Sequence, residues 1–380
     1  MRAENGFGMR DEVCEPHKVK RYFWNNYSEK LYISAMVIPQ DFVSFVADFK
    51  LNVKLIGYLW CFGCGAGCWV LGGCGDYGAK SLHLLSLWKG GDQLRFFQAD
   101  LHEEGSFDEA VKGCIGVFHV AASMEFNVRD KENNEAFVQA NITDPAIKGT
   151  INLLKSCLKS NSVKRVVFTS SISTITAKDI NGKWKSIVDE SCQIHPDTVW
   201  NTQASGWVYA LSKLLTEEAA FQFAKENGID LVSVISSTVA GPFFTANVPT
   251  SVKVLVSPLT GETEYFRILS AVNARMGSIV LVHIEDICSA HIFLMEHAKA
   301  EGRYICSSQS CALSDLATLL SKVYSNSNIY QKTEKIYDKV PSEISSKKLQ
   351  DLGFSYKHDL EDIIYQTLMC CLDYGYLPPV

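Results

Sequence analysis

The chain has 380 residues and a formal net charge of −6, with 47% hydrophobic and 21% charged residues. This composition is ordinary for a globular protein, and the length suffices for one large domain or two modest ones with a sizeable core. The acidic balance, without a basic stripe, argues against nucleic acid and anionic membranes as partners. No uninterrupted apolar stretch reaches the length of a membrane span.

The 13 cysteines are scattered, and several lie inside apolar runs, as Cys306 does. An odd, scattered set predicts reduced thiols rather than a disulfide framework. No apolar segment of the kind found in secretory signals follows Met1, so we expect a cytoplasmic protein. Four cysteines near the N-terminus have only loosely metal-like spacing, without paired knuckles or a nearby histidine, and we predict no metal site.

Residues 1–50 are interpreted as an N-terminal extension, because they show no clear period and are interrupted by Pro39. Residues 51–78 are rich in Cys, Gly and Trp, and they form an aberrant start to the next domain. Within them Gly72, Gly75 and Gly78 have the G-x-x-G-x-x-G spacing of a phosphate-binding turn. Only a short helical segment separates these glycines from the next strand, so a plain loop is favoured by roughly three to one.

From residue 79 onward, strands and helices alternate regularly. Strands are expected at 94–99, 116–122, 165–171 and 230–239, and helices at 133–160 and 209–227, the last one closed by Gly228. This βαβα alternation predicts an α/β fold with a Rossmann-like, doubly wound parallel sheet. We therefore predict a Rossmann domain over residues 51–242. Residues 243–380 are predicted to form a smaller substrate lobe, interleaved with the last strands of the sheet.

Polar and small residues follow the predicted strands at the edge where such sheets bind their ligands. Ser171 ends one strand, and Tyr209 and Lys213 lie four residues apart at the start of the next helix, on one face. A serine hydroxyl can hold a substrate carbonyl, the tyrosine can transfer a proton, and the lysine charge lowers the tyrosine pKa. Ser170 is the rival for the serine role. A chance pair on a helix face is the alternative, and the strand before it favours catalysis by roughly nine to one.

Two histidines have structural alternatives. His119 lies inside an apolar strand and is predicted to be a hydrogen-bonded core residue rather than a ligand. For His283, a structural hydrogen bond and a role in a pocket are equally favoured interpretations.

Several motifs together resemble one known family over about residues 79 to 378. These motifs are Val117-Phe118-His119-Val120-Ala121, Phe168-Thr169-Ser170-Ser171, Asp189-Glu190-Ser191-Cys192, Tyr209-Ala210-Leu211-Ser212-Lys213, Val239-Ala240-Gly241-Pro242 and Gly302-Arg303-Tyr304-Ile305-Cys306. They resemble the plant dihydroflavonol 4-reductase, anthocyanidin reductase and cinnamoyl-CoA reductase group. This group belongs to the extended short-chain dehydrogenase/reductases, within the NAD-dependent epimerase/dehydratase superfamily. Residues 178–184 and 276–279 are more similar to the anthocyanidin reductase branch.

The resemblance implies a Rossmann domain that binds NADPH and a C-terminal lobe that covers a small phenolic substrate. It implies that Ser171, Tyr209 and Lys213 are catalytic, and that Tyr209 and Lys213 also contact the cofactor. The remaining implied cofactor contacts are Lys80 at the 2′-phosphate, Asp100 and Leu101 at the adenine, Val120 and Ala121 along the cofactor, and Ser236 beside the nicotinamide. Thr176 is the implied substrate contact. Lys80 is as readily explained by simple solvation as by phosphate binding.

Two departures from the family pattern stand out. Ser236 occupies a position where relatives usually carry Pro. Residues 1–78 lack the recognisable first strand, Gly-rich turn and helix of the family, which is typical of an out-of-frame or mis-spliced N-terminus. Two alternatives to an active phenolic reductase follow. One is a family member whose cofactor site is defective, and the other is a nucleotide-sugar epimerase or steroid dehydrogenase, which share the Ser/Tyr/Lys set.

Overall fold

The computed structural model of the chain describes residues 32–39, 68–72, 96–122, 125–128, 134–243, 248–324 and 341–379. The strands are β1 (Tyr32–Pro39), β2 (Cys68–Gly72), β3 (Phe96–Gln98), β4 (Cys114–His119), β5 (Arg165–Ser171), β6 (Ile187–Val188), β7 (Leu231–Ser236), β8 (Thr238–Ala240), β9 (Ile279–His283), β10 (Gly302–Cys306), β11 (Gln309–Cys311) and β12 (Glu343–Ile344). The helices are α3 (Asp108–Val111), α4 (Glu135–Val138), the π-helix η4 (Gln139–Thr143), α5 (Asp144–Ser160), the 3₁₀ helix η5 (Ile172–Thr174), α6 (Pro196–Thr202), α7 (Trp207–Asn227), α8 (Thr250–Thr260), α9 (Thr263–Met276), α10 (Ile284–Glu296), α11 (Leu313–Val323), α12 (Lys347–Asp351) and α13 (Leu360–Asp373).

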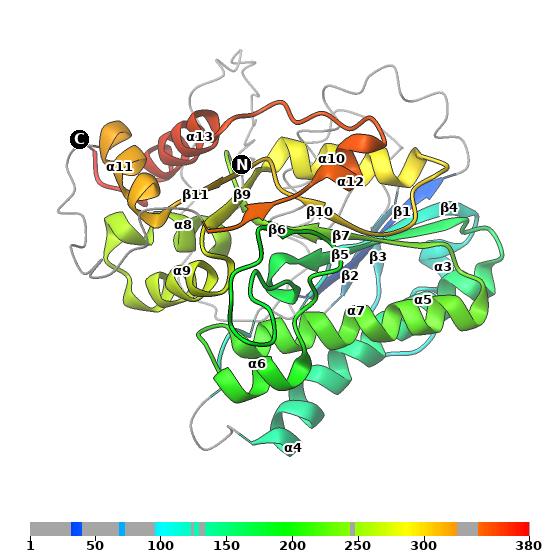
Figure 1. Cartoon of the computed structure of the whole chain (residues 1–380). Helices are drawn as coiled ribbons and strands as arrows, with labels where there is room; N and C mark the ends of the chain where they lie inside the picture. Colours follow the sequence, from blue (N-terminus) through cyan, green and yellow to red (C-terminus); the bar gives the residue numbers. More distant parts are fainter. Residues whose placement is uncertain are drawn as a thin grey trace, which may run out of the picture. The chain divides into compact units, whose positions relative to one another are not determined.

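A seven-stranded sheet lies at the centre of the described structure, with the strand order β10-β7-β5-β4-β1-β2-β3 (Figure 1). Strands β4, β5, β7 and β10 pair in parallel, and β2 pairs in parallel with β3. The α/β class and the parallel sheet predicted from the sequence are confirmed. Because β4, β5 and β7 run in the same direction, their carboxyl ends meet at one edge of the sheet.

Strand β1 differs from the predicted all-parallel order, because it runs antiparallel to both of its neighbours, β2 and β4. An antiparallel strand needs no crossover helix on the face of the sheet, and mixed sheets of this kind are common in α/β proteins. Strand β1 falls within the predicted N-terminal extension, and β2 within the Gly-rich segment 51–78. Most of that segment, including Gly75 and Gly78, lies outside the described residues.

Helices cover both faces of the parallel strands, and the alternation of side chains along β5 shows why. Val166 and Phe168 belong to a core cluster that includes residues of α5 and α7. Val167 points to the opposite face and belongs to a second cluster with residues of α10, such as Ile287. Successive side chains of a strand alternate between its faces, so this fully buried strand carries apolar residues on both. Helix α7 therefore packs against this face of β5 through a shared apolar cluster.

A second, smaller group of elements follows residue 243 and surrounds the sheet β11-β9-β8. Helices α8, α9, α11 and α13 lie together at this end of Figure 1, and they share one apolar core cluster. Buried residues of that cluster include Leu255, Leu269, Leu316 and Leu368. Strand β10 then returns to the large sheet and pairs with β7, so the later part of the chain contributes to both sheets.

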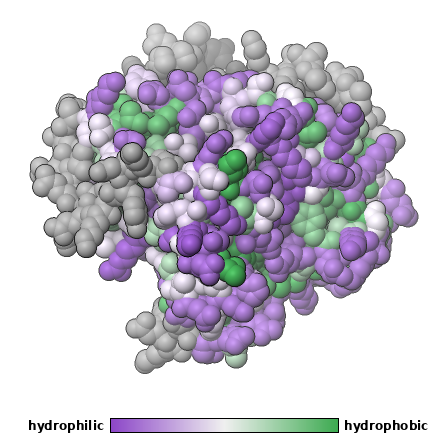
Figure 2. All heavy atoms as spheres, viewed as in Figure 1, coloured by the Kyte–Doolittle hydropathy of each residue, from purple (hydrophilic) through white to green (hydrophobic). Residues whose placement is uncertain are grey.

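Polar side chains cover most of the face shown in Figure 2, and smaller apolar areas lie between them. The large apolar side chains exposed among the described residues are few, with Ile180 and Ile187 among them. None of the helices in the described part combines the length and the apolar composition that a membrane span requires.

Gly241, directly after β8, tests how tightly the backbone packs against His283 at the end of β9. Its φ is +122°, and an added Cβ would lie 2.8 Å from Nε2 of the fully buried His283. We expect Gly241→Ala to lower the free energy of unfolding by about 2–5 kcal/mol, the sum of backbone strain and overpacking. Gly113→Ala is the matched control, because Gly113 has a φ of +73° but no atom within 4 Å of its added Cβ. Urea denaturation of both variants measures the difference, and an equal loss in the two would contradict the packing argument.

Candidate active site

Ser171 stands at the junction between β5 and η5. Its backbone is still extended, and its side-chain oxygen accepts a hydrogen bond of 3.2 Å from the backbone N–H of Ser173. The hydroxyl thus caps the 3₁₀ turn and is held at the carboxyl edge of the sheet. The side chain of Ser171 is half-buried, so its oxygen remains accessible to a ligand.

Tyr209 lies in the first turn of α7, opposite Ser171. The helix begins after Gly206, whose φ of +84° lets the chain turn into it. The ring of Tyr209 packs on Phe126, with the ring centroids 5.2 Å apart. Burial raises the pKa of Tyr209, and a hydrogen bond with the side chain of Ser171 opposes that rise. The structure therefore brings together the Ser171 and Tyr209 side chains that the sequence paired, and this contact favours Ser171 over Ser170.

Lys213 is one turn further along α7, with 4% of its surface exposed. Its Nζ donates a hydrogen bond to the backbone oxygen of Thr169 and lies 4.5 Å from the centroid of the Phe168 ring. Burial lowers the pKa of Lys213 to about 8, and the negative charge of Glu217 opposes this effect. The sequence predicted that Lys213 would lower the pKa of Tyr209. In the structure burial outweighs any such effect, and the ammonium is turned toward the β5 carbonyl.

The predicted cofactor contacts fall into two groups. Ser236 ends β7 directly beside Ser171 in the sheet register, and its hydroxyl donates to the backbone oxygen of Ser237 at 3.0 Å. Val120 and Ala121 follow β4 and are half-buried at the same edge. These three positions lie on, or directly after, the two strands that neighbour β5, the strand that ends at Ser171.

The second group lies farther away, after the edge strand β3. The carboxylate of Asp100 accepts a hydrogen bond of 2.8 Å from the backbone of His102, and hydrogen bonds with His102 hold its pKa below the usual value despite partial burial. The backbone oxygen of Leu101 accepts from Asn152 at 2.8 Å. Strands β1 and β2 separate this turn from β4. Lys80 lies outside the described residues.

Thr176 begins the segment that leaves the active site. Its hydroxyl oxygen accepts a hydrogen bond of 3.2 Å from the backbone of Lys178, and its own backbone N–H donates to Cys192 at 2.9 Å. The side chain is half-buried, so the hydroxyl hydrogen can still donate to a ligand.

The residues at this edge fit the nicotinamide end of a dinucleotide. Ser170 and Ser173 flank Ser171, and their buried hydroxyls have no hydrogen-bond partner among the described residues. A buried polar group without a partner marks a place where a ligand or water completes the hydrogen bonds.

The two histidines singled out from the sequence have structural partners. His119 is buried, and its Nε2 lies 2.8 Å from the hydroxyl of Thr150, as expected for a core residue. His283 caps α10, where its Nδ1 accepts from the backbone of Glu285 at 3.1 Å. The ligand atoms of His283, Glu285 and His358 lie within 4.8 Å of one another, the spacing of a possible metal cluster. However, a histidine that accepts at Nδ1 carries its proton on Nε2, so neither nitrogen of neutral His283 offers a lone pair to a metal.

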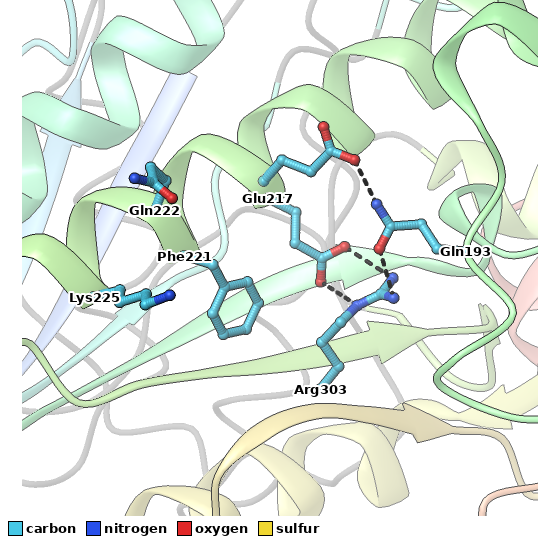
Figure 3. Close-up of a pocket in the computed structure, with 7 residues that line it drawn as sticks. Gln193, Glu217, Phe221, Gln222, Lys225 and Arg303 are labelled. Atoms are coloured by element: carbon cyan, nitrogen blue, oxygen red, sulfur yellow. Dashed lines mark hydrogen bonds and ion pairs between the residues drawn. The ribbon is translucent and has the colours of Figure 1, made fainter.

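Sequence reasoning gave no role to two charged residues, Glu217 and Arg303, although Arg303 belongs to one of the family motifs. Glu217 follows Lys213 by one helical turn, and Arg303 comes from β10. The two point toward each other in a pocket of about 280 Å³ (Figure 3). The four-residue spacing of Tyr209, Lys213 and Glu217 was the signal that could have identified Glu217, because such residues share one helix face.

The chain is similar in sequence and in structure to several known proteins. The family model described as "NAD dependent epimerase/dehydratase family" matches residues 78–306. A putative anthocyanidin reductase of Ginkgo biloba is 44% identical over 76% of this chain and 82% of its own length. A dihydroflavonol 4-reductase of Arabidopsis thaliana is 38% identical over 79% and 74%. The crystal structure of vestitone reductase from alfalfa superposes with a TM-score of 0.67 and 30% identity, covering 86% of this chain and 96% of that one.

Burial of Lys213 predicts a dependence of stability on pH. The unfolded chain binds this proton more tightly than the folded chain does, since the pKa falls from 10.5 to about 8 on folding. The free energy of unfolding should therefore rise with pH between about 8 and 10.5, by at most about 1.4 kcal/mol per pH unit from this group. Lys213→Met should remove that contribution.

Lys225→Met is the control, because Lys225 is exposed on the same helix. Urea denaturation across this pH range compares the slopes of the two variants with the wild type. Equal slopes in the wild type and Lys213→Met would contradict the depressed pKa.

Proposed function

The chain belongs to the NAD dependent epimerase/dehydratase family, and on that premise we propose that it is an NADPH-dependent reductase of a flavonoid-type or related phenolic substrate. The family resemblance expected from the motifs is confirmed. The observation that carries the proposal is the juxtaposition of the Ser171 and Tyr209 side chains beside the buried Lys213. This set can hold a carbonyl oxygen and deliver a proton to it.

Each catalytic residue has a defined task in this proposal. The Ser171 hydroxyl donates a hydrogen bond to the substrate oxygen and orients the carbon beside it. The Tyr209 phenol supplies the proton to that oxygen, and the Lys213 ammonium stabilises the phenolate that remains. The nicotinamide, when bound, supplies the hydride. Tyr209 and Lys213 would also hold the nicotinamide ribose.

The remaining assignments follow the position of each residue in the fold. Ser236, Val120 and Ala121 would line the nicotinamide end, because they surround Ser171 at the carboxyl edge of the sheet. Asp100 and Leu101 would meet the adenine after β3. Lys80 is retained as the candidate for the 2′-phosphate, on the family resemblance alone.

The substrate is assigned to the lobe after residue 243, together with the segment that begins at Thr176. Two relatives named as anthocyanidin or dihydroflavonol reductases, and a solved vestitone reductase, support a flavonoid-type class. We place the protein in the cytoplasm, in line with the free, buried cysteines of the described residues. The composition of the chain changes abruptly at Ala79. For this reason one alternative to an active reductase stays open, namely a family member that no longer binds the cofactor.

Tyr209→Phe tests the catalytic assignment. Loss of the phenol should lower turnover of dihydroflavonol or anthocyanidin substrates by roughly 100-fold or more, since a positioned proton donor contributes that much. Binding of NADPH, followed by energy transfer from tryptophan to the bound cofactor, should persist. Tyr365→Phe is the control, because Tyr365 is 55% exposed on α13.

The outcomes separate the two functions. Unchanged turnover in Tyr209→Phe refutes the role of Tyr209. Wild-type protein that shows no saturable NADPH binding is instead the cofactor-defective family member.

A further inference from the structure

We propose that the buried Arg303–Glu217 pair is the positioning device of this active site, because it ties Ser171 to the helix that carries Tyr209 and Lys213. The proposal deepens the proposed reductase function and rests on it. Neither residue touches the reacting atoms in this account. Both act through the residues that do.

Arg303 uses every N–H that a guanidinium offers. Its Nε and one terminal nitrogen donate to the two oxygens of Glu217, at 3.3 and 3.1 Å. The other terminal nitrogen donates to the backbone oxygen of Glu190 and to Oε1 of Gln193, both at 2.9 Å. The fifth N–H goes to the hydroxyl oxygen of Thr174 at 3.1 Å. Five donors with five acceptors fix the guanidinium in one orientation.

The Thr174 contact leads directly to the catalytic serine. Thr174 is fully buried at the end of η5, the turn that Ser171 caps. Its hydroxyl accepts from Arg303 and donates to the backbone oxygen of Ser171 at 2.9 Å. A hydroxyl has one hydrogen and two lone pairs, so it can make both bonds at once. Arg303 is thus two hydrogen bonds away from the backbone of Ser171.

The Glu217 side of the pair leads to the other two catalytic residues. Tyr209, Lys213 and Glu217 follow one another at four-residue intervals on α7, and Glu217 also accepts a hydrogen bond from Ser233 of β7. Its side chain is only 3% exposed and that of Arg303 14% exposed, so water screens the pair poorly. Figure 3 shows the carboxylate and the guanidinium facing each other between the helix and the sheet. The pair therefore fixes both the rotation and the height of α7 relative to Ser171.

The Glu217 carboxylate also acts on Lys213 by its charge. The groups shown to act on the Lys213 ammonium are the Thr169 carbonyl and the Phe168 ring on β5 and the Glu217 carboxylate on α7. His291 of α10 binds the Thr169 hydroxyl but is held neutral, because burial lowers its pKa to about 4. Glu217 is thus the negative charge that opposes the effect of burial on the pKa of Lys213.

Three variants test the positioning role. Arg303→Lys keeps the charge but cannot form the fork, and Thr174→Val removes the hydroxyl that links Arg303 to Ser171. Each should lower kcat by roughly 10- to 100-fold with little change in KM, as expected when reacting groups are displaced slightly. The double variant should be no slower than Arg303→Lys alone, because both changes break the same link.

Glu217→Gln should shift the alkaline limb of the kcat profile to lower pH.

Arg165→Lys is the matched control. Arg165 is also buried and holds four partners at the start of β5, namely Asp230 and the carbonyls of Leu294, His297 and Ala300. Its replacement should lower thermal stability as Arg303→Lys does, but leave kcat and its pH profile unchanged. An equal loss of kcat in Arg165→Lys, or none in Arg303→Lys and Thr174→Val, would overturn the proposal. So would an unmoved alkaline limb in Glu217→Gln.

A readout without substrate keeps this proposal separate from the proposed function. The tyrosinate absorbance of wild type minus Tyr209→Phe reports the ionisation of Tyr209 alone. Arg303→Lys should raise the pKa of Tyr209, because it displaces Ser171, whose side chain lowers that pKa. An unchanged titration contradicts the positioning role even if the protein reduces no phenolic substrate, whereas a shifted titration in an inactive protein leaves only the reductase function refuted.

Discussion

A lysine ammonium buried between a helix and a sheet is the constraint on which the rest of this structure depends. Lys213 is almost without solvent contact, and burial of an unpaired charge costs several kcal/mol. The carbonyl of Thr169, the face of Phe168 and the charge of Glu217 offset that cost. Each of them exists only if α7 packs against β5 in a single register. The burial of a charged lysine and the packing of the central layer are thus one requirement.

That requirement explains why the polar network lies under the active site rather than at the surface. The buried Glu217 carboxylate itself needs a partner of opposite charge, and Arg303 provides it from β10. Since Arg303 also reaches Thr174, the same guanidinium connects the helix to the turn that begins at Ser171. Strand β10, which interrupts the elements around the smaller sheet, thereby joins the large sheet and holds its carboxyl edge.

Much of this could be predicted from the sequence, because the relevant signals are local. The apolar run of β5 begins and ends at the expected residues, and Gly228 ends α7 with a positive φ, as a C-cap should. The Ser171–Tyr209 contact followed from strand and helix positions alone. Arg303 could not be found this way, since its partners are up to 129 residues distant. The raised pKa of Tyr209 was likewise missed, because burial depends on packing that no spacing reveals.

The central claim is that this set of residues reduces a phenolic substrate with hydride from NADPH. The most direct measurement uses NADPH deuterated at the transferable position of the nicotinamide, incubated with the full chain and a dihydroflavonol or an anthocyanidin. Mass spectrometry of the product then locates the label. We expect deuterium bound to carbon in the reduced product, in step with the loss of NADPH. Protein that binds NADPH saturably yet passes no deuterium to either substrate would contradict it.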